Sequence, residues 1–245
     1  MTDEKFLDKK MDRREFLKKA GIGGAGLALG LSGASAFFAN QDSSTKKALD
    51  GDEDISFFGK HQAGITTPMQ KACYLVVLDL HTTDKKEVIQ LFKDWTDYSS
   101  KLVEGELVKK DGSNALLPPT DTGETVGLNP YRLSLTFGVS ADFLKKLGLE
   151  SKRPKLFRDL PPFPKEQLQD KYTGGDIVIQ ACADDEQVAF HAVRNLIRKG
   201  RNKITMKWSK SGFAAIGDRK ETPRNLFGFK DGTANVTTEK EFDKV

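Results

Sequence analysis

The order of apolar segments between residues 73 and 216 constrains the fold of this chain more than any other feature. Four short β-branched and apolar runs predict strands at 73–80, 131–140, 174–183 and 203–216, the last as a strand or a hairpin. Apolar residues at helical spacing predict a helix after the first run (Val88, Leu91, Phe92, Trp95, Leu102) and another after the third (Val188, Ala192, Val193, Leu196, Ile197). The order strand, helix, strand, strand, helix, strand predicts an α+β, ferredoxin-like fold, with an antiparallel sheet and its helices on one face.

Small polar residues mark where the two long helices begin. Thr83 or Asp84 can cap the first, and Asp184 or Asp185 can cap the second. Between the first helix and the second strand lies a long segment, 104–129, which is rich in Gly, Pro, Asp and Thr. Loops of this length in a compact domain are usually functional or disordered.

The N-terminal segment is typical of an export signal. Arg13 and Arg14 form the twin-arginine pattern, a weakly apolar and glycine-rich run follows, and the small residues 34–36 offer a cleavage site. An uncleaved membrane anchor over 21–39 is the alternative. We expect residues 1–36 to be a cleaved twin-arginine signal, which directs a folded protein to the periplasm or the extracytoplasmic face of the cell envelope.

Charge and cysteine content narrow the possible partners. The net charge of +4 is spread along the chain without a long basic run, so we expect no nucleic-acid partner. The two cysteines, Cys73 and Cys182, lie in apolar runs and have neither redox nor zinc spacing. They are interpreted as buried free thiols, although the first and third strands of this fold are neighbours, so a disulfide between them stays possible.

The three histidines, His61, His81 and His191, are not paired with other residues at metal-ligand spacing. We interpret each as a surface or packing histidine. The sequence also contains no nucleophile elbow, phosphate-binding loop or dinucleotide-binding glycine pattern.

One apolar loop, "NLFGFKDGTAN" at 225–235, carries a single acid, Asp231. Asp followed by Gly is a common turn pair, so a turn is one explanation. A chemical role for the carboxylate is the other, and composition and spacing leave both open.

Four segments in this order resemble the dye-decolourising (DyP-type) haem peroxidases, in particular their exported deferrochelatase/peroxidase branch. They are "HQAGITTPMQ", "RLSLTFGVS", "GGDIVIQACADDEQVAFHAVRNLIR" and "RNLFGFKDGTAN", of which the last contains the family's GxxDG motif. The resemblance implies two ferredoxin-like units, a haem b cofactor and Asp231 as the distal catalytic acid. It also implies that haem lies against Gly228, Phe229, Gly232, Thr233 and Ala234.

The same resemblance implies a set of partners. Besides haem, these are hydrogen peroxide, an organic reductant, an iron-uptake permease and lipoprotein, and a second copy in a homo-oligomer. Iron release from haem, with the porphyrin left intact, is an expected activity. The proximal haem-ligand histidine and the distal arginine lie beyond the motif in the family, so we expect both beyond Val245 and no metal ligand before it.

We therefore expect four segments along the chain: the signal (1–36), a flexible lead-in (37–55), a ferredoxin-like domain (56–222), and the motif loop with the start of a truncated second domain (223–245). The truncation is expected to leave an apolar face exposed and the 245 residues alone inactive. Two other functions stay open: an exported haem-binding or delivery protein without redox turnover, and a ferredoxin-like interaction module.

Overall fold

The computed structural model describes residues 55–109, 118–214, 224–230, 232 and 236. All of them belong to one compact unit, Gly51–Val245. The predicted signal and nearly all of the predicted lead-in lie outside the described residues, so the proposed segment boundaries stay predictions. Among the residues that the structure describes, no helix is long and apolar enough to cross a membrane.

The described part of the chain contains a four-stranded antiparallel sheet. Its strands are β1 (Ala72–Leu80), β2 (Ser134–Val139), β3 (Ile177–Ala183) and β4 (Ile204–Phe213). Their order across the sheet is β2-β3-β1-β4. This arrangement confirms the predicted ferredoxin-like topology, in which the first and third strands are neighbours.

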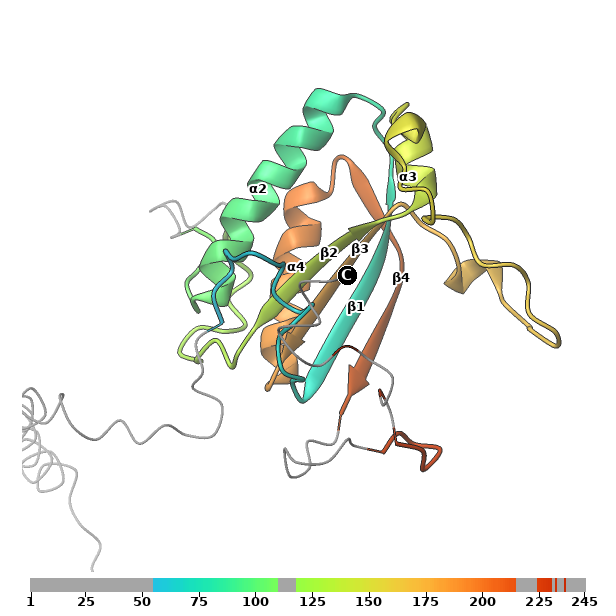
Figure 1. Ribbon diagram of the computed structural model, residues 1–245. Helices are drawn as coiled ribbons and strands as arrows, with labels where there is room; N and C mark the ends of the chain where they lie inside the picture. The colour runs from blue at the N-terminus through green and yellow to red at the C-terminus, as the bar shows by residue number, and fades with distance from the viewer. Residues whose placement is uncertain (1–54, 110–117, 215–223, 231, 233–235, 237–245) are drawn as a thin grey trace, which may run out of the picture. The chain divides into compact units, whose positions relative to one another are not determined.

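Two long helices, α2 (Lys85–Val103) and α4 (Glu186–Gly200), cover one face of the sheet (Figure 1). Asp84 and Asp185 cap them, since each side chain accepts a hydrogen bond from a backbone N–H of the first turn. The predicted cap positions are thus confirmed. The shorter elements are α3 (Ala141–Lys146), capped by Ser140, and two 3-10 turns, η1 (Glu150–Lys152) and η2 (Asp170–Tyr172).

Trp95 of α2 is the largest fully buried side chain between the helices and the sheet. Its indole ring stacks on Phe137 of β2, with 5.7 Å between the ring centroids. Its Nε1 donates a hydrogen bond to the backbone oxygen of Leu196 in α4, at 2.8 Å. One side chain therefore joins α2, α4 and the sheet, and its polar atom has a partner inside the core.

Two strands begin later than the alternation of residues predicts. The predicted strand at 131–140 starts at Ser134, because Tyr131 and Arg132 have φ values of 46° and 54°, in the left-handed region that a strand cannot use. The predicted strand at 174–183 starts at Ile177, after Gly175 at φ 120°. A Cβ at Gly175 would lie 2.2 Å from Cγ1 of Val77, so glycine is required there by both conformation and space.

The edge strand β4 is a single strand, and most of its side chains are exposed. Its exposed residues include Lys207 and Lys210. The ammonium group of Lys210 lies 4.9 Å from the ring centroid of Tyr172 in η2, so the segment before β3 comes close to this edge.

Cys73 of β1 and Cys182 of β3 are register partners in adjacent strands, which confirms that the fold brings them together. Both are free thiols. Each is half-buried, so the expectation that both are buried was wrong. They face away from the helices, because their strand neighbours Ala72, Ala181 and Ala183 occupy the face that the helices cover.

Candidate functional site: the motif loop and a buried histidine network

The motif loop, residues 224–230 and 232 of the described chain, contains a tight turn held by Asn225. The side-chain oxygen of Asn225 accepts hydrogen bonds from the backbone N–H groups of Phe227 (3.1 Å) and Phe229 (3.2 Å). The backbone N–H of Asn225 donates to the carbonyl of Phe229, and that of Gly228 donates to the carbonyl of Asn225, both at 2.9 Å. One asparagine therefore closes the loop on itself, because an Asn side chain can mimic a backbone turn.

The backbone conformation of the loop requires glycine at two positions. Gly228 has a φ of 84° and Gly232 a φ of 73°, both in the left-handed region. A Cβ at Gly228 would meet no described atom within 4 Å. Conformation therefore explains this glycine, and the space beside it is open to another group.

The turn presents its apolar side chains outward. Leu226 is 89% exposed, Phe227 86% and Phe229 70%. Neighbouring large apolar side chains at this exposure mark a surface that binds another group or another part of the protein. Two of the predicted haem-binding residues, Gly228 and Phe229, lie on this turn.

The structure describes the other predicted haem-site residues only in part or not at all. Gly232 is described by its backbone conformation, and its predicted haem contact stays a prediction. Asp231, Thr233 and Ala234 lie outside the described residues. Their predicted roles are therefore untested by the geometry.

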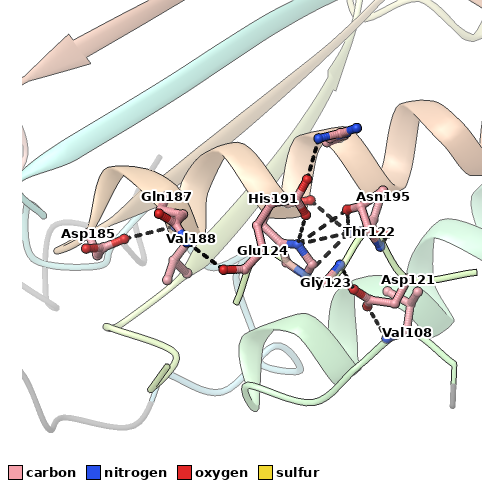
Figure 2. Close-up of polar contacts among 11 residues, drawn as sticks. Val108, Asp121, Thr122, Gly123, Glu124, Asp185, Gln187, Val188, His191 and Asn195 are labelled. Carbon is pink, nitrogen blue, oxygen red and sulfur yellow. Dashed lines mark hydrogen bonds and ion pairs between the residues drawn. The ribbon is translucent and has the colours of Figure 1, made fainter. Parts of the chain in front are cut away.

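A second polar cluster, which the sequence did not predict, surrounds His191 of α4 (Figure 2). His191 is only 2% exposed. Its Nδ1 lies 2.6 Å from Oε2 of Glu124, and its Nε2 lies 3.5 Å from Oδ1 of Asp121. The side-chain amide of Asn195, one helical turn further along α4, donates to the backbone oxygen of His191 and to Oγ1 of Thr122.

This cluster fastens the long loop to α4. Asp121 also accepts hydrogen bonds from the backbone N–H groups of Val108 (2.9 Å) and Gly123 (2.7 Å), which joins the two described stretches of the loop, 104–109 and 118–129. Arg194 donates to the other oxygen of Glu124. The loop predicted at 104–129 is therefore held in place where it is described.

The sequence predicted each histidine to be either a surface residue or a packing residue. His191 is buried and acts in packing, whereas His61 and His81 are exposed. Among the described residues, no group of three His, Cys, Asp or Glu side chains is arranged to hold a metal ion. A signal for the cluster was present in the sequence, since His191 and Asn195 lie on the same inward stripe as Val188 and Ala192. Buried polar side chains on such a stripe require partners.

Glu124 has a strongly perturbed acidity. Its burial opposes ionisation, but hydrogen bonds from Thr122 and His191, together with the charge of His191, outweigh this and lower the pKa of Glu124 to about 2. The carboxylate is therefore ionised over the whole range in which proteins usually function.

The low pKa of Glu124 predicts a pH-dependent contribution to stability. The pKa falls from 4.5 to about 2 on folding, so the unfolded chain binds this proton more tightly than the folded chain. The contribution is therefore fully present above about pH 4.5 and is lost as the pH falls toward 2. We expect Glu124→Gln to lower the urea midpoint of the full-length protein at pH 7, with the difference from wild type narrowing at pH 3.

Glu106→Gln is the matched control, because Glu106 is an exposed acid at the start of the same loop and its side chain is not part of the cluster. Its urea midpoint should follow that of the wild type at each pH, as measured by circular dichroism. If the urea midpoints of Glu124→Gln and wild type differ by the same amount at pH 7 and at pH 3, the lowered pKa of Glu124 does not contribute to stability as predicted.

Comparison with known proteins identifies the family. The profile described as "Dyp-type peroxidase, N-terminal" matches residues 62–214, which contain the whole sheet, both long helices and the described part of the His191 cluster. The chain belongs to the Dyp-type peroxidase family. The motif loop lies beyond the end of the Dyp-type match at residue 214.

Curated relatives in the family carry the name deferrochelatase. The protein from Escherichia coli O157:H7 is 34% identical over 235 residues, which are 94% of this chain and 55% of the relative. The protein from Yersinia pseudotuberculosis is 38% identical over 186 residues, covering 73% of this chain and 42% of the relative. The chain thus spans about half the length of the curated relatives it matches.

Solved Dyp-type structures share the fold. A DyP-type peroxidase from Streptomyces coelicolor superposes with a TM-score of 0.68 at 37% identity, covering 79% of this chain and 51% of that one. Ferric DtpA from Streptomyces lividans gives a TM-score of 0.69, also at 37% identity and with the same coverage. These similarities confirm the family fold for the described sheet and helices.

Proposed function

We propose that the full-length protein is a haem b-dependent peroxidase of the Dyp type that also releases iron from haem. One observation supports this most directly: the GxxDG loop presents Leu226, Phe227 and Phe229 outward, immediately before Asp231. The deferrochelatase name of the curated relatives supports the iron-releasing activity.

The described residues of the loop fit a flat apolar cofactor. The exposed ring of Phe229 offers apolar contact, and Gly228 leaves open space where any other residue would place a Cβ. The main chain of Gly232, Thr233 and Ala234 is proposed to follow against the same group. When bound, haem b supplies the redox-active iron at which peroxide is reduced.

Asp231 is proposed to move the proton that peroxide reduction requires. Its carboxylate accepts the proton from one peroxide oxygen and returns it to the other, which then leaves as water. Between Asn225 and Asn235 the loop carries no second carboxylate. A single group therefore acts first as base and then as acid.

Export is the second part of the proposal. Arg13 and Arg14, with the small residues at 34–36, support translocation of the folded protein to the periplasm or the extracytoplasmic face of the envelope. There the proposed partners are an organic reductant, an iron-uptake permease and a lipoprotein. We also propose that the protein forms a homo-oligomer.

One experiment tests cofactor, activity and location together. Cells that make the full-length protein are fractionated, and the protein is purified from the extracytoplasmic fraction. We expect a Soret band and peroxide-dependent oxidation of a dye, together with loss of iron from added haem and recovery of protoporphyrin. A colourless protein that also fails to bind added haem would overturn the proposal.

A further inference from the structure

Four residues form a row across the sheet face that the helices leave open. Cys73 of β1 lies between Cys182 of β3 and Gly212 of β4, and Cys182 lies next to Ser134 of β2. Glycine at position 212 leaves the β4 side of Cys73 uncovered, and a Cβ built there would still lie 4.0 Å from the Cβ of Cys73. The side chain that meets Cys73 in this row is therefore Cys182.

The spacing of the strands suits a disulfide. Register partners in antiparallel strands have Cα atoms about 4.5 to 5.5 Å apart. Disulfides span Cα separations of about 4.4 to 6.8 Å. A bond between Cys73 and Cys182 therefore requires no change in strand register.

A small molecule can reach both sulfur atoms. The two cysteines line one cavity of about 370 Å³, together with residues such as Met69, Gln180 and Gly212. A water molecule occupies about 30 Å³ in the liquid, so hydrogen peroxide, with two oxygen atoms, fits easily. Both side chains are half-buried, which leaves each partly accessible.

The two thiols are chemically unequal. A hydrogen bond from Cys182 lowers the pKa of Cys73 to about 7, although burial acts in the opposite direction. The same hydrogen bond, with burial, raises the pKa of Cys182. Cys73 therefore carries the nucleophilic thiolate near neutral pH, and Cys182 is placed to react second.

We propose that Cys73 and Cys182 form a redox-active dithiol, which hydrogen peroxide oxidises to a disulfide between β1 and β3. The sulfur of Cys73 attacks one peroxide oxygen, the O–O bond breaks, and water leaves with a Cys73 sulfenic acid as product. The sulfur of Cys182 then attacks the sulfur of Cys73, and a second water leaves as the S–S bond forms. Two thiols lose two electrons and two protons in total, and one peroxide becomes two waters.

This modification site is separate from the motif loop. It uses no haem and no residue between 224 and 236, so it stands whether or not the proposed peroxidase activity is found. A reducing dithiol reverses it, which makes the state of the pair dependent on the surrounding redox conditions.

The test uses the full-length protein, first reduced and then treated with hydrogen peroxide. Peptide mapping by mass spectrometry is expected to find Cys73 and Cys182 peptides joined with the loss of two hydrogens, and dithiothreitol is expected to restore both thiols. In Cys182→Ser, dimedone should trap a sulfenic acid at Cys73. Cys73→Ser lacks the attacking thiol, so peroxide should produce no joined peptide in this variant.

Circular dichroism of both variants checks that they fold. A joined peptide already present in protein purified without reductant also supports the proposal. It is overturned if both cysteines stay unmodified by peroxide in the native protein, if they are oxidised beyond sulfenic acid without joining, or if dimedone traps no sulfenic acid in Cys182→Ser.

Discussion

Asp231→Ala in the full-length protein is expected to lower peroxide-dependent dye oxidation by about 10²- to 10⁴-fold, the usual contribution of a positioned general acid–base group. The Soret band should remain, because the apolar turn that includes Phe229 and the glycine backbone at 228 does not depend on the carboxylate. Steady-state dye oxidation measures the expected loss of activity, and haem titration of the same preparations checks that the Soret band remains.

Two further variants are compared with Asp231→Ala. Asp231→Asn keeps the size and polarity of the side chain but cannot accept the proton, so it should lose activity to the same degree as alanine. Glu106→Gln changes an exposed acid far along the chain and should leave turnover unchanged. An exported haem carrier without redox turnover would behave the same with aspartate or alanine at position 231. Loss of the Soret band in Asp231→Asn would instead indicate that the residue holds the cofactor.

Trp95→Ala is expected to lower the free energy of unfolding by about 3 to 5 kcal/mol, the usual effect of removing a large aromatic side chain from a core. Trp95 is 1% exposed, and its ring lies against Phe92 and Phe137. Its removal leaves a cavity where α2, α4 and β2 meet. Urea unfolding of the full-length protein, followed by far-ultraviolet circular dichroism, measures the change.

Trp95→Phe is the matched control for this prediction. Phenylalanine keeps an aromatic ring against Phe137 but lacks the N–H group that donates to the Leu196 carbonyl. We expect a smaller loss of about 1 to 2 kcal/mol, from one hydrogen bond and part of the ring volume. A loss below about 1 kcal/mol for Trp95→Ala would show that this part of the core repacks freely.

The sequence predicted the strands, helices and helix caps because those features depend on local periodicity and on single polar residues. Asp84 and Asp185 cap the helices as expected. The left-handed backbone at Tyr131 and Arg132 could not be predicted, because these are not residues that favour it, and the alternation of side chains continues through them. Tertiary contacts, and not local preference, decide the conformation there.

The candidate site was only partly predictable. A histidine on an inward helical stripe could be recognised as needing partners. Its partner Glu124 lies 67 residues earlier in a loop without periodicity, so no local pattern identifies it. The motif loop was recognised through family resemblance, because an Asp-Gly pair alone predicts only a turn. In the structure, the described turn is closed by Asn225 and precedes that pair.

The position of β4 at the edge of the sheet has a consequence for how the protein behaves at high concentration. An edge strand of ten residues exposes backbone groups to which a strand of another molecule could add, the first step toward aggregation. The charged side chains of Lys207 and Lys210 make such an addition unfavourable, and Tyr172 lies beside one of them. A folded chain with this edge can therefore stay dispersed at high concentration.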